Sequence, residues 1–239
     1  MRTYRNLWLA VAAVALSIAP CAFGQGQVNI NLTSAGNNVM DGVYVGPYTA
    51  TVNGSSTQII CDDFSDESYV GESWTANVTT LSNLNGTKWG GMANATQLYD
   101  EAAWLATQML SKTYSGNPTQ VGYLAYALWA TFQPSQVENW LGANSAAWLA
   151  VESWLSSAAG QHFTPGEFSN FFLYTPNTNY PITCNGQSCA NTPPQEFFGF
   201  LSAPEGGSTL MYILLATLVC AGAIWLRSRR PMEGPVAAV

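Results

Sequence analysis

The residues with the clearest chemical potential are Cys61, Asp62 and Asp63, followed closely by Asp66 and Glu67. A cysteine thiolate is a nucleophile, and four carboxylates offer the hard oxygen atoms that Ca²⁺ prefers. The stretch lacks the spacing and the glycine of an EF-hand loop, so the acidic residues favour a solvated strand end over a calcium site. We therefore expect neither a metal nor a cofactor.

The single histidine, His162, limits the catalysis that Cys61 could perform. A cysteine nucleophile needs a base within hydrogen-bonding reach and a further residue that orients the base. The sequence shows no such arrangement around His162, which is expected to lie in a loop. A zinc site built from His162, Cys184 and Cys189 would have too few ligands. We therefore expect that the protein is not an enzyme.

The use of cysteine fits an oxidising compartment. Cys184 and Cys189 flank the turn in CNGQSC and are predicted to form a disulfide that closes a small loop. Cys21 and Cys220 lie in the two apolar ends of the chain, which leaves Cys61 over. An odd cysteine in such a compartment needs an explanation, and a buried free thiol is its ordinary state.

Residues 40–80 are predicted to form strands. The runs Val43–Val52 and Thr57–Phe64 are separated by a stretch that contains Asn-Gly, a dipeptide typical of hairpin turns, so the two runs should pair. Pro47 favours an edge or a bulge in the first of them. The segment ESWTANVTTLS is a third candidate strand, and the short segment QEFFGFL is expected to close the sheet.

Residues 95–158 change to the period of a helix. Apolar residues define three helical segments, the second starting at Asn117-Pro118 and the third capped by Asn144 or Ser145. A long loop with several prolines is expected to follow the third. We expect an α+β fold, an antiparallel β-sheet with an inserted three-helix segment. The apolar residues that define the helices are Leu98, Ala102, Leu105 and Met109; Val121, Leu124, Leu128 and Phe132; and Trp148, Val151, Leu155 and Ala158.

The N-terminus has the pattern of a secretory signal peptide over residues 1–24. Arg2 and Arg5 precede the apolar run Leu7–Ile18, and small residues stand before the expected cleavage at Gln25. This pattern predicts export and processing by signal peptidase. Residues 25–202 would then form one extracellular domain, which is long enough to bury a core.

A second apolar run lies near the C-terminus. Thr209–Leu226 contains eighteen residues without a charge, about 27 Å as a helix at 1.5 Å per residue. Arginines follow it, and basic residues favour the cytoplasmic side of a membrane. The run therefore predicts one C-terminal transmembrane helix at 209–226 with a short cytoplasmic tail at 231–239.

A short polar motif precedes the apolar run, and a basic stop follows it. The motif is Pro204, Glu205, Gly206 and Gly207, and the basic stop is Arg227, Arg229 and Arg230. In this order, residues 203–230 resemble the PEP-CTERM class of exosortase sorting signals in its PEGG variant. The resemblance implies that an exosortase-type membrane protease recognises the segment while it sits in the inner membrane, and then removes it. Two features depart from the pattern: Gly206 stands in place of the second proline, and nine residues follow the arginines. An ordinary single-span anchor stays open as the alternative.

Five segments occur in order along the middle of the chain: DGVYVGPYTATVNG, IICDDF, YDEAAWLATQML, YLAYALWATF and PQEFFGF. This layout resembles a recurrent extracellular domain of PEP-CTERM proteins. The segments IICDDF and YLAYALWATF are also similar, more remotely, to surface thioester domains. In that family a strand cysteine bonds a helix glutamine to give an electrophile. Cys61 stands at the cysteine position, but Ala125 fills the glutamine position, and neither Gln108 nor Gln120 follows the pattern. The resemblance therefore implies the scaffold without the thioester bond.

The charge of residues 25–202 excludes one class of partner. Fourteen residues of the chain are acidic, and all but Glu205 and Glu233 fall in this segment, where Lys88 and Lys112 are the only basic residues. Nucleic-acid binding depends on clustered Lys and Arg, so we expect no nucleic-acid partner.

We expect an exported cell-envelope or extracellular-matrix protein with a non-enzymatic, structural or glycan-associated role, for which an exopolysaccharide is a candidate partner. After processing it would reside at the cell surface or in the matrix. Three alternatives stay open. They are a surface adhesin with a Cys61-based thioester, a simple single-span membrane-anchored domain, and a hydrolase.

Overall fold

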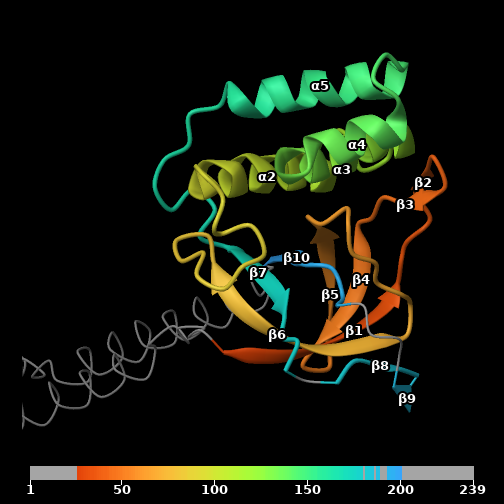
Figure 1. Cartoon of the computed structure of the whole chain (residues 1–239), viewed down its shortest axis with the longest axis vertical. Helices are drawn as coiled ribbons and strands as arrows, with labels where there is room; N and C mark the ends of the chain where they lie inside the picture. Colours follow the sequence, from red (N-terminus) through yellow and green to blue (C-terminus); the bar gives the residue numbers. More distant parts are fainter. Residues whose placement is uncertain (1–25, 180, 186, 189–192, 201–239) are drawn as a thin grey trace, which may run out of the picture. The chain divides into compact units, whose positions relative to one another are not determined.

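Six antiparallel strands close into a barrel in the computed structural model, which describes residues 26–179, 181–185, 187–188 and 193–200. They pair in the order β1-β4-β5-β10-β7-β6, and β6 pairs back with β1 to complete the ring (Figure 1). Their bounds are β1 (Gln27–Ser34), β4 (Tyr48–Val52), β5 (Ser55–Cys61), β6 (Glu72–Thr80), β7 (Phe171–Pro176) and β10 (Phe197–Phe200).

Two short hairpins complete the described strands. Strands β2 (Val39–Met40) and β3 (Val43–Tyr44) pair only with each other. Strand β8 (Thr183–Cys184) pairs with β6 and with β9 (Gln187–Ser188).

The hairpin predicted around Asn-Gly is confirmed, although its first strand is shorter than expected. Strands β4 and β5 pair in antiparallel register from Val52↔Ser55 outwards. Asn53 and Gly54 both have positive φ angles, 49° and 83°. Two positive φ angles define the turn that matches the natural twist of paired strands, and Asn-Gly adopts it readily. Val43 and Tyr44, which we expected in the same strand, form β3 instead.

Side chains fill the inside of the barrel. The ring of Phe197 is stacked on Trp74, with 5.9 Å between ring centroids, and meets Tyr48 edge-on at 5.8 Å. Side chains along a strand point alternately to its two faces. Inward residues of β1 and β6 are accordingly buried, whereas their neighbours are polar and more exposed. The barrel is a packed core of the kind expected for few strands. The buried residues are Ile30, Leu32, Trp74 and Ala76, and the polar ones are Asn29, Asn31, Ser73 and Thr75.

Gly199 of β10 leaves room for an aromatic ring from the next strand. A Cβ atom at this position would lie 2.1 Å from Cε2 of Tyr174, on β7. We expect Gly199→Ala to lower the free energy of unfolding by about 1–3 kcal/mol, because the ring and backbone must shift within a packed wall. Urea denaturation measures the loss. Gly91→Ala is the matched control, since a Cβ there has no atom within 4 Å. Equal stability of the two variants would contradict the prediction.

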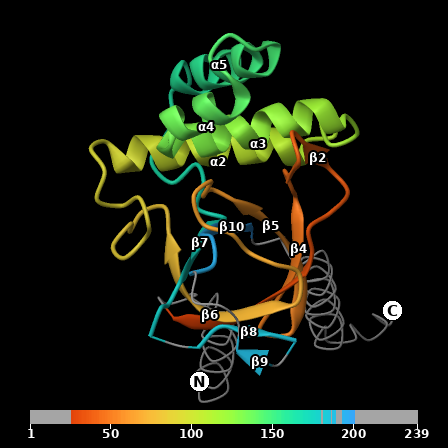
Figure 2. The ribbon, with the colours of Figure 1, turned by 45° about the vertical axis from the view of Figure 1, so that its right-hand side comes forward.

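Four helices form a layer on one side of the barrel, and α5 lies farthest from the strands (Figures 1 and 2). Helix α3 lies between the barrel and α5, and its side chains are buried around most of its circumference. The expected caps are present: the Asn117 side chain accepts from the amide of Gln120 at 3.2 Å, and Ser145 accepts from the amide of Trp148 at 2.9 Å. The helices are α2 (Ala95–Leu110), α3 (Pro118–Phe132), α4 (Pro134–Leu141) and α5 (Ala146–Ala159).

The fold class expected from the sequence is wrong in its architecture. The sheet is closed, and the helical segment contains four helices where three were expected. Helix α4, which the sequence analysis did not anticipate, spans eight residues and begins at Pro134. A proline at the first helical position is well tolerated because its missing N–H has no partner there. Strand β7 lies in the segment expected to be a loop.

No helix in the described part of the chain is long and apolar enough to cross a membrane. The transmembrane helix expected at residues 209–226 falls outside the described residues, as do the signal peptide and the tail at 231–239.

Candidate functional site

The structure gathers polar side chains where β5 ends and β10 begins. Cys61, the last residue of β5, pairs with Phe197, the first residue of β10, in antiparallel register. Asp62, which follows Cys61, therefore lies opposite Glu196, which precedes Phe197. The amide of Asp62 donates to the carbonyl of Glu196 at 3.3 Å. Backbone pairing therefore places two carboxyl groups side by side. We call the group formed by Asp62, Asp63, Glu196, Tyr99 and Lys88 the carboxyl cluster.

Glu196 is the centre of the carboxyl cluster, and its side chain is fully buried. It accepts hydrogen bonds from the Tyr99 hydroxyl at 2.6 Å, from the Lys88 amide at 2.9 Å and from the Thr175 hydroxyl. Tyr99 in turn accepts from the amide of Trp89 at 3.2 Å. Three donors from different segments of the chain therefore reach one buried carboxyl group. Glu196 thereby joins β10, β7, α2 and the loop before α2.

Asp62 is the partner of Glu196 and is also fully buried. No donor among the described residues reaches either of its carboxyl oxygens. Burial, then the neighbouring charges of Glu196 and Asp63, raises the pKa of Asp62 well above its ordinary value. The buried site therefore favours the neutral, protonated form of Asp62. In that form its carboxylic acid could donate a hydrogen bond to the neighbouring carboxyl group of Glu196.

Asp63 organises the loop that follows β5. Its Oδ1 atom accepts from the amide and the hydroxyl of Ser65, both at 3.0 Å, and from the amide of Asp66 at 3.3 Å. Its other oxygen forms an ion pair with Lys88, which also pairs with Asp66 at 2.7 Å. Burial alone would lower the pKa of Lys88, but the hydrogen bonds to Asp63 and Asp66 outweigh it and raise that pKa. Lys88 therefore stays a cation inside an acidic loop.

Cys61 is a buried free thiol. Its Sγ atom donates to the carbonyl of Asp63 at 3.0 Å, and its own carbonyl accepts from the indole of Trp129 at 2.9 Å. Burial, then the charges of Asp63 and Asp62, raises the pKa of the Cys61 thiol. Since the thiolate is the reactive form, this cysteine is a poor nucleophile in the folded protein.

The strand and helix quoted for the thioester resemblance do meet in the structure, because the Trp129 indole of α3 contacts the end of β5. Ala125 lies on the same helix and is buried. An alanine methyl group offers no carboxamide for Cys61 to bond, so the arrangement supplies no electrophile at this point.

Several residues singled out in the sequence lie away from the carboxyl cluster. His162 is exposed in the loop after α5. Glu67 is exposed and accepts from the hydroxyl of Tyr69. Cys184 ends β8, but its predicted disulfide partner, Cys189, falls outside the described residues, so the disulfide stays a prediction. The sorting motif and the arginines after it also fall outside. Within the described part of the chain, no three His, Cys, Asp or Glu side chains converge as metal ligands.

Sequence reasoning missed Glu196, Tyr99, Thr175 and the role of Lys88. A signal was present for two of them. Glu196 directly precedes the apolar strand FFGF, where a carboxylate is out of place unless it has partners. Lys88 is one of two basic residues in the predicted extracellular domain and is therefore a natural partner for buried acids.

Comparison with known proteins found no matching family model, curated protein or solved structure.

Proposed function

We propose that the chain is an exported structural protein of the cell envelope or extracellular matrix, which binds other components without performing catalysis. Its C-terminal sequence would be an exosortase-type sorting signal. The observation that carries this proposal is the burial of the groups that could act as nucleophile, acid or base. Cys61, Asp62, Asp63 and Glu196 are each at most 1% exposed, so none of them is accessible to a substrate in solution.

Sealed groups of this kind support a role in holding the fold together. A general acid or base must lie within hydrogen-bonding reach of the substrate atom it serves, and a nucleophilic cysteine must be ionised and accessible. The buried carboxyl groups of the carboxyl cluster do not meet the first condition, and Cys61 does not meet the second. The cluster joins strands and a helix that are far apart in the chain. The hydrogen bond from Tyr99 to Glu196, for example, connects residues that are 97 positions apart.

The charge of the described domain supports a location among neutral or positively charged matrix components. Its two lysines stand against twelve acidic side chains, and one of them, Lys88, is occupied by Asp63 and Asp66. Such a surface repels other anions, including an anionic membrane surface. The acidic surface of the domain is therefore expected to bind polysaccharides and proteins that carry no strong negative charge.

The intact mass of the protein isolated from the organism that makes it tests this proposal. We expect a chain that begins at Gln25 and ends near Pro204 or Glu205, with complete loss of both flanking segments. Retention of residues 1–24 would contradict export by signal peptidase. Retention of the residues up to Val239 would contradict sorting.

A matched pair of variants makes the same test sharper. The double change Pro204→Ala and Glu205→Ala removes the two defining residues of the sorting motif. We expect it to abolish C-terminal processing while N-terminal cleavage continues. Glu233→Ala, which removes an acidic residue beyond the arginines, should be processed like the wild type. Normal processing of the double variant would show that the motif is not a sorting signal.

A further inference from the structure

Trp140 is a large aromatic side chain that packs against the protein on one side and is exposed to solvent on the other. It lies near the end of α4 and is 55% exposed. Its ring meets Phe64 edge-on, with 5.9 Å between centroids, and Phe64 packs against Trp129 at 5.4 Å and Tyr126 at 6.0 Å. By contrast, Trp129 is buried in the core. The indole of Trp140 therefore rests on a rigid aromatic base and still presents surface to solvent.

The β2–β3 hairpin carries a second exposed aromatic ring, that of Tyr44. Tyr44 is 51% exposed. The hairpin is attached to α3 by a hydrogen bond from the Tyr126 hydroxyl to the carbonyl of Met40, 3.1 Å long. Tyr126 also packs against Phe64, the residue on which Trp140 rests. Trp140 and the hairpin thus flank one aromatic group.

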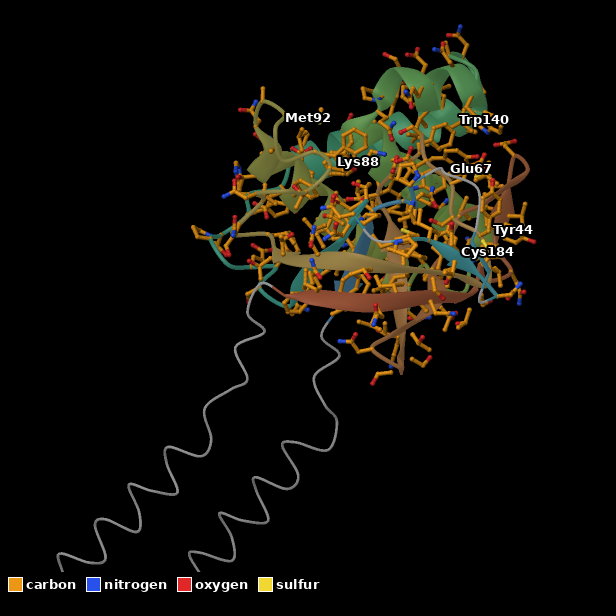
Figure 3. All side chains as sticks on the ribbon, turned by 60° about the horizontal axis from the view of Figure 1, so that its bottom comes forward. Tyr44, Glu67, Lys88, Met92, Trp140 and Cys184 are labelled. Atoms are coloured by element: carbon orange, nitrogen blue, oxygen red, sulfur yellow. The ribbon has the colours of Figure 1, made fainter. Side chains whose placement is uncertain are left out.

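Acidic side chains accompany these exposed rings. In Figure 3, Glu67 lies on the same side of the domain as Trp140 and Tyr44. Glu67 follows Phe64 by three residues, and Asp41 in the turn of the β2–β3 hairpin is close enough to Tyr126 to influence it electrostatically. A ligand of this surface therefore meets aromatic rings and negative charge together.

We propose that Trp140 and Tyr44, with Glu67, form a binding platform for a polysaccharide that carries free amino groups. The C–H face of a sugar ring is apolar and packs on an aromatic ring, which contributes buried area and a specific geometry. A protonated amino group on the sugar pairs with the carboxylates, and this pairing rejects anionic sugars that would pack equally well on the rings. The inference rests on the proposed matrix function and names its ligand class.

Binding of defined oligosaccharides to the full chain tests the platform. The probes are a chitosan hexamer, which carries amino groups, its N-acetylated counterpart, and an oligogalacturonate of similar length. We expect the chitosan hexamer to bind most tightly in calorimetry, with an affinity that falls as salt rises because surface charges are screened. Equal or tighter binding of the acetylated or the anionic probe would overturn the proposal, as would no binding of the chitosan hexamer.

Two pairs of variants locate the site. Trp140→Ala should weaken chitosan binding about tenfold, whereas Leu149→Ala, at a residue 58% exposed on α5, should leave it unchanged. Glu67→Gln should weaken it several-fold, and Glu152→Gln, at an exposed position on α5, should not. Thermal unfolding checks that each variant is folded. Equal affinities within a pair overturn the site. The processing test is independent of these residues, so a failure of the matrix function and a failure of the platform remain distinguishable.

Discussion

Replacing Glu196 with alanine is expected to lower the free energy of unfolding by about 3–5 kcal/mol, because three donors lose their buried acceptor at roughly 1–3 kcal/mol each. The change leaves the hydroxyl of Tyr99, the hydroxyl of Thr175 and the amide of Lys88 without their acceptor. Each of these groups is costly to bury unsatisfied.

Urea denaturation followed by circular dichroism measures this loss, with Glu152→Ala as the matched control. Glu152 is an exposed glutamate on α5, where a change is expected to stay within about 0.5 kcal/mol. Glu196→Gln should fall between the two, because the amide keeps one acceptor oxygen for the donors. If Glu196→Ala is as stable as the Glu152→Ala control, the cluster does not hold the fold together.

Replacing Asp62 with asparagine is expected to change how stability depends on pH. In the folded protein, the pKa of Asp62 is raised, first by burial and then by Glu196 and Asp63. In the unfolded chain, Asp62 loses its proton near pH 3.9. Between these two pKa values the folded state binds one proton more than the unfolded state. The contribution of Asp62 to stability is therefore complete below about pH 4 and is lost as pH rises towards the folded pKa.

The size of the effect follows from the linkage of one proton. Wild type is expected to lose about 1.4 kcal/mol of stability per pH unit relative to Asp62→Asn across that window. Both proteins keep the neighbouring groups Glu196, Asp63 and Lys88, so the difference between the two curves reports the replacement of Asp62.

Asp66→Asn is the control for the pH experiment, since Asp66 is partly exposed and pairs with the same lysine. We expect this variant to keep the wild-type slope between pH 5 and pH 8. Denaturation curves recorded at several pH values give the comparison. A difference between wild type and Asp62→Asn that stays constant over this range would show that Asp62 is ionised in the folded protein.

Local features of the chain were predictable from the sequence. The Asn53-Gly54 turn specifies its own backbone angles, and Asn117 and Ser145 cap helices with their own side chains. Such features depend on a few neighbouring residues. The closure of the barrel does not, because β1 must pair with β4 on one side and with β6 on the other. The sequence of β1 alone does not indicate that this strand pairs with both β4 and β6.

The candidate site also has one part that the sequence indicates and another that depends on distant segments of the chain. Cys61, Asp62 and Asp63 stand out as a cluster in the sequence, but nothing there distinguishes a solvated strand end from a buried one. The structure decides this, because Lys88 and Glu196 approach from distant segments. Strand β7 was missed because prolines around it suggested a loop, although Pro176 stands only at its last position.

Strand β10 has a consequence for the order of folding. It is the last described strand along the chain, yet it lies in the middle of the barrel wall, between β5 and β7. Until β10 has been synthesised, β5 and β7 keep open edges, which invite pairing with other chains. The barrel must therefore wait for contacts between distant segments, and such folds form slowly. A protein built this way needs protection from self-association during synthesis until its final strand is in place.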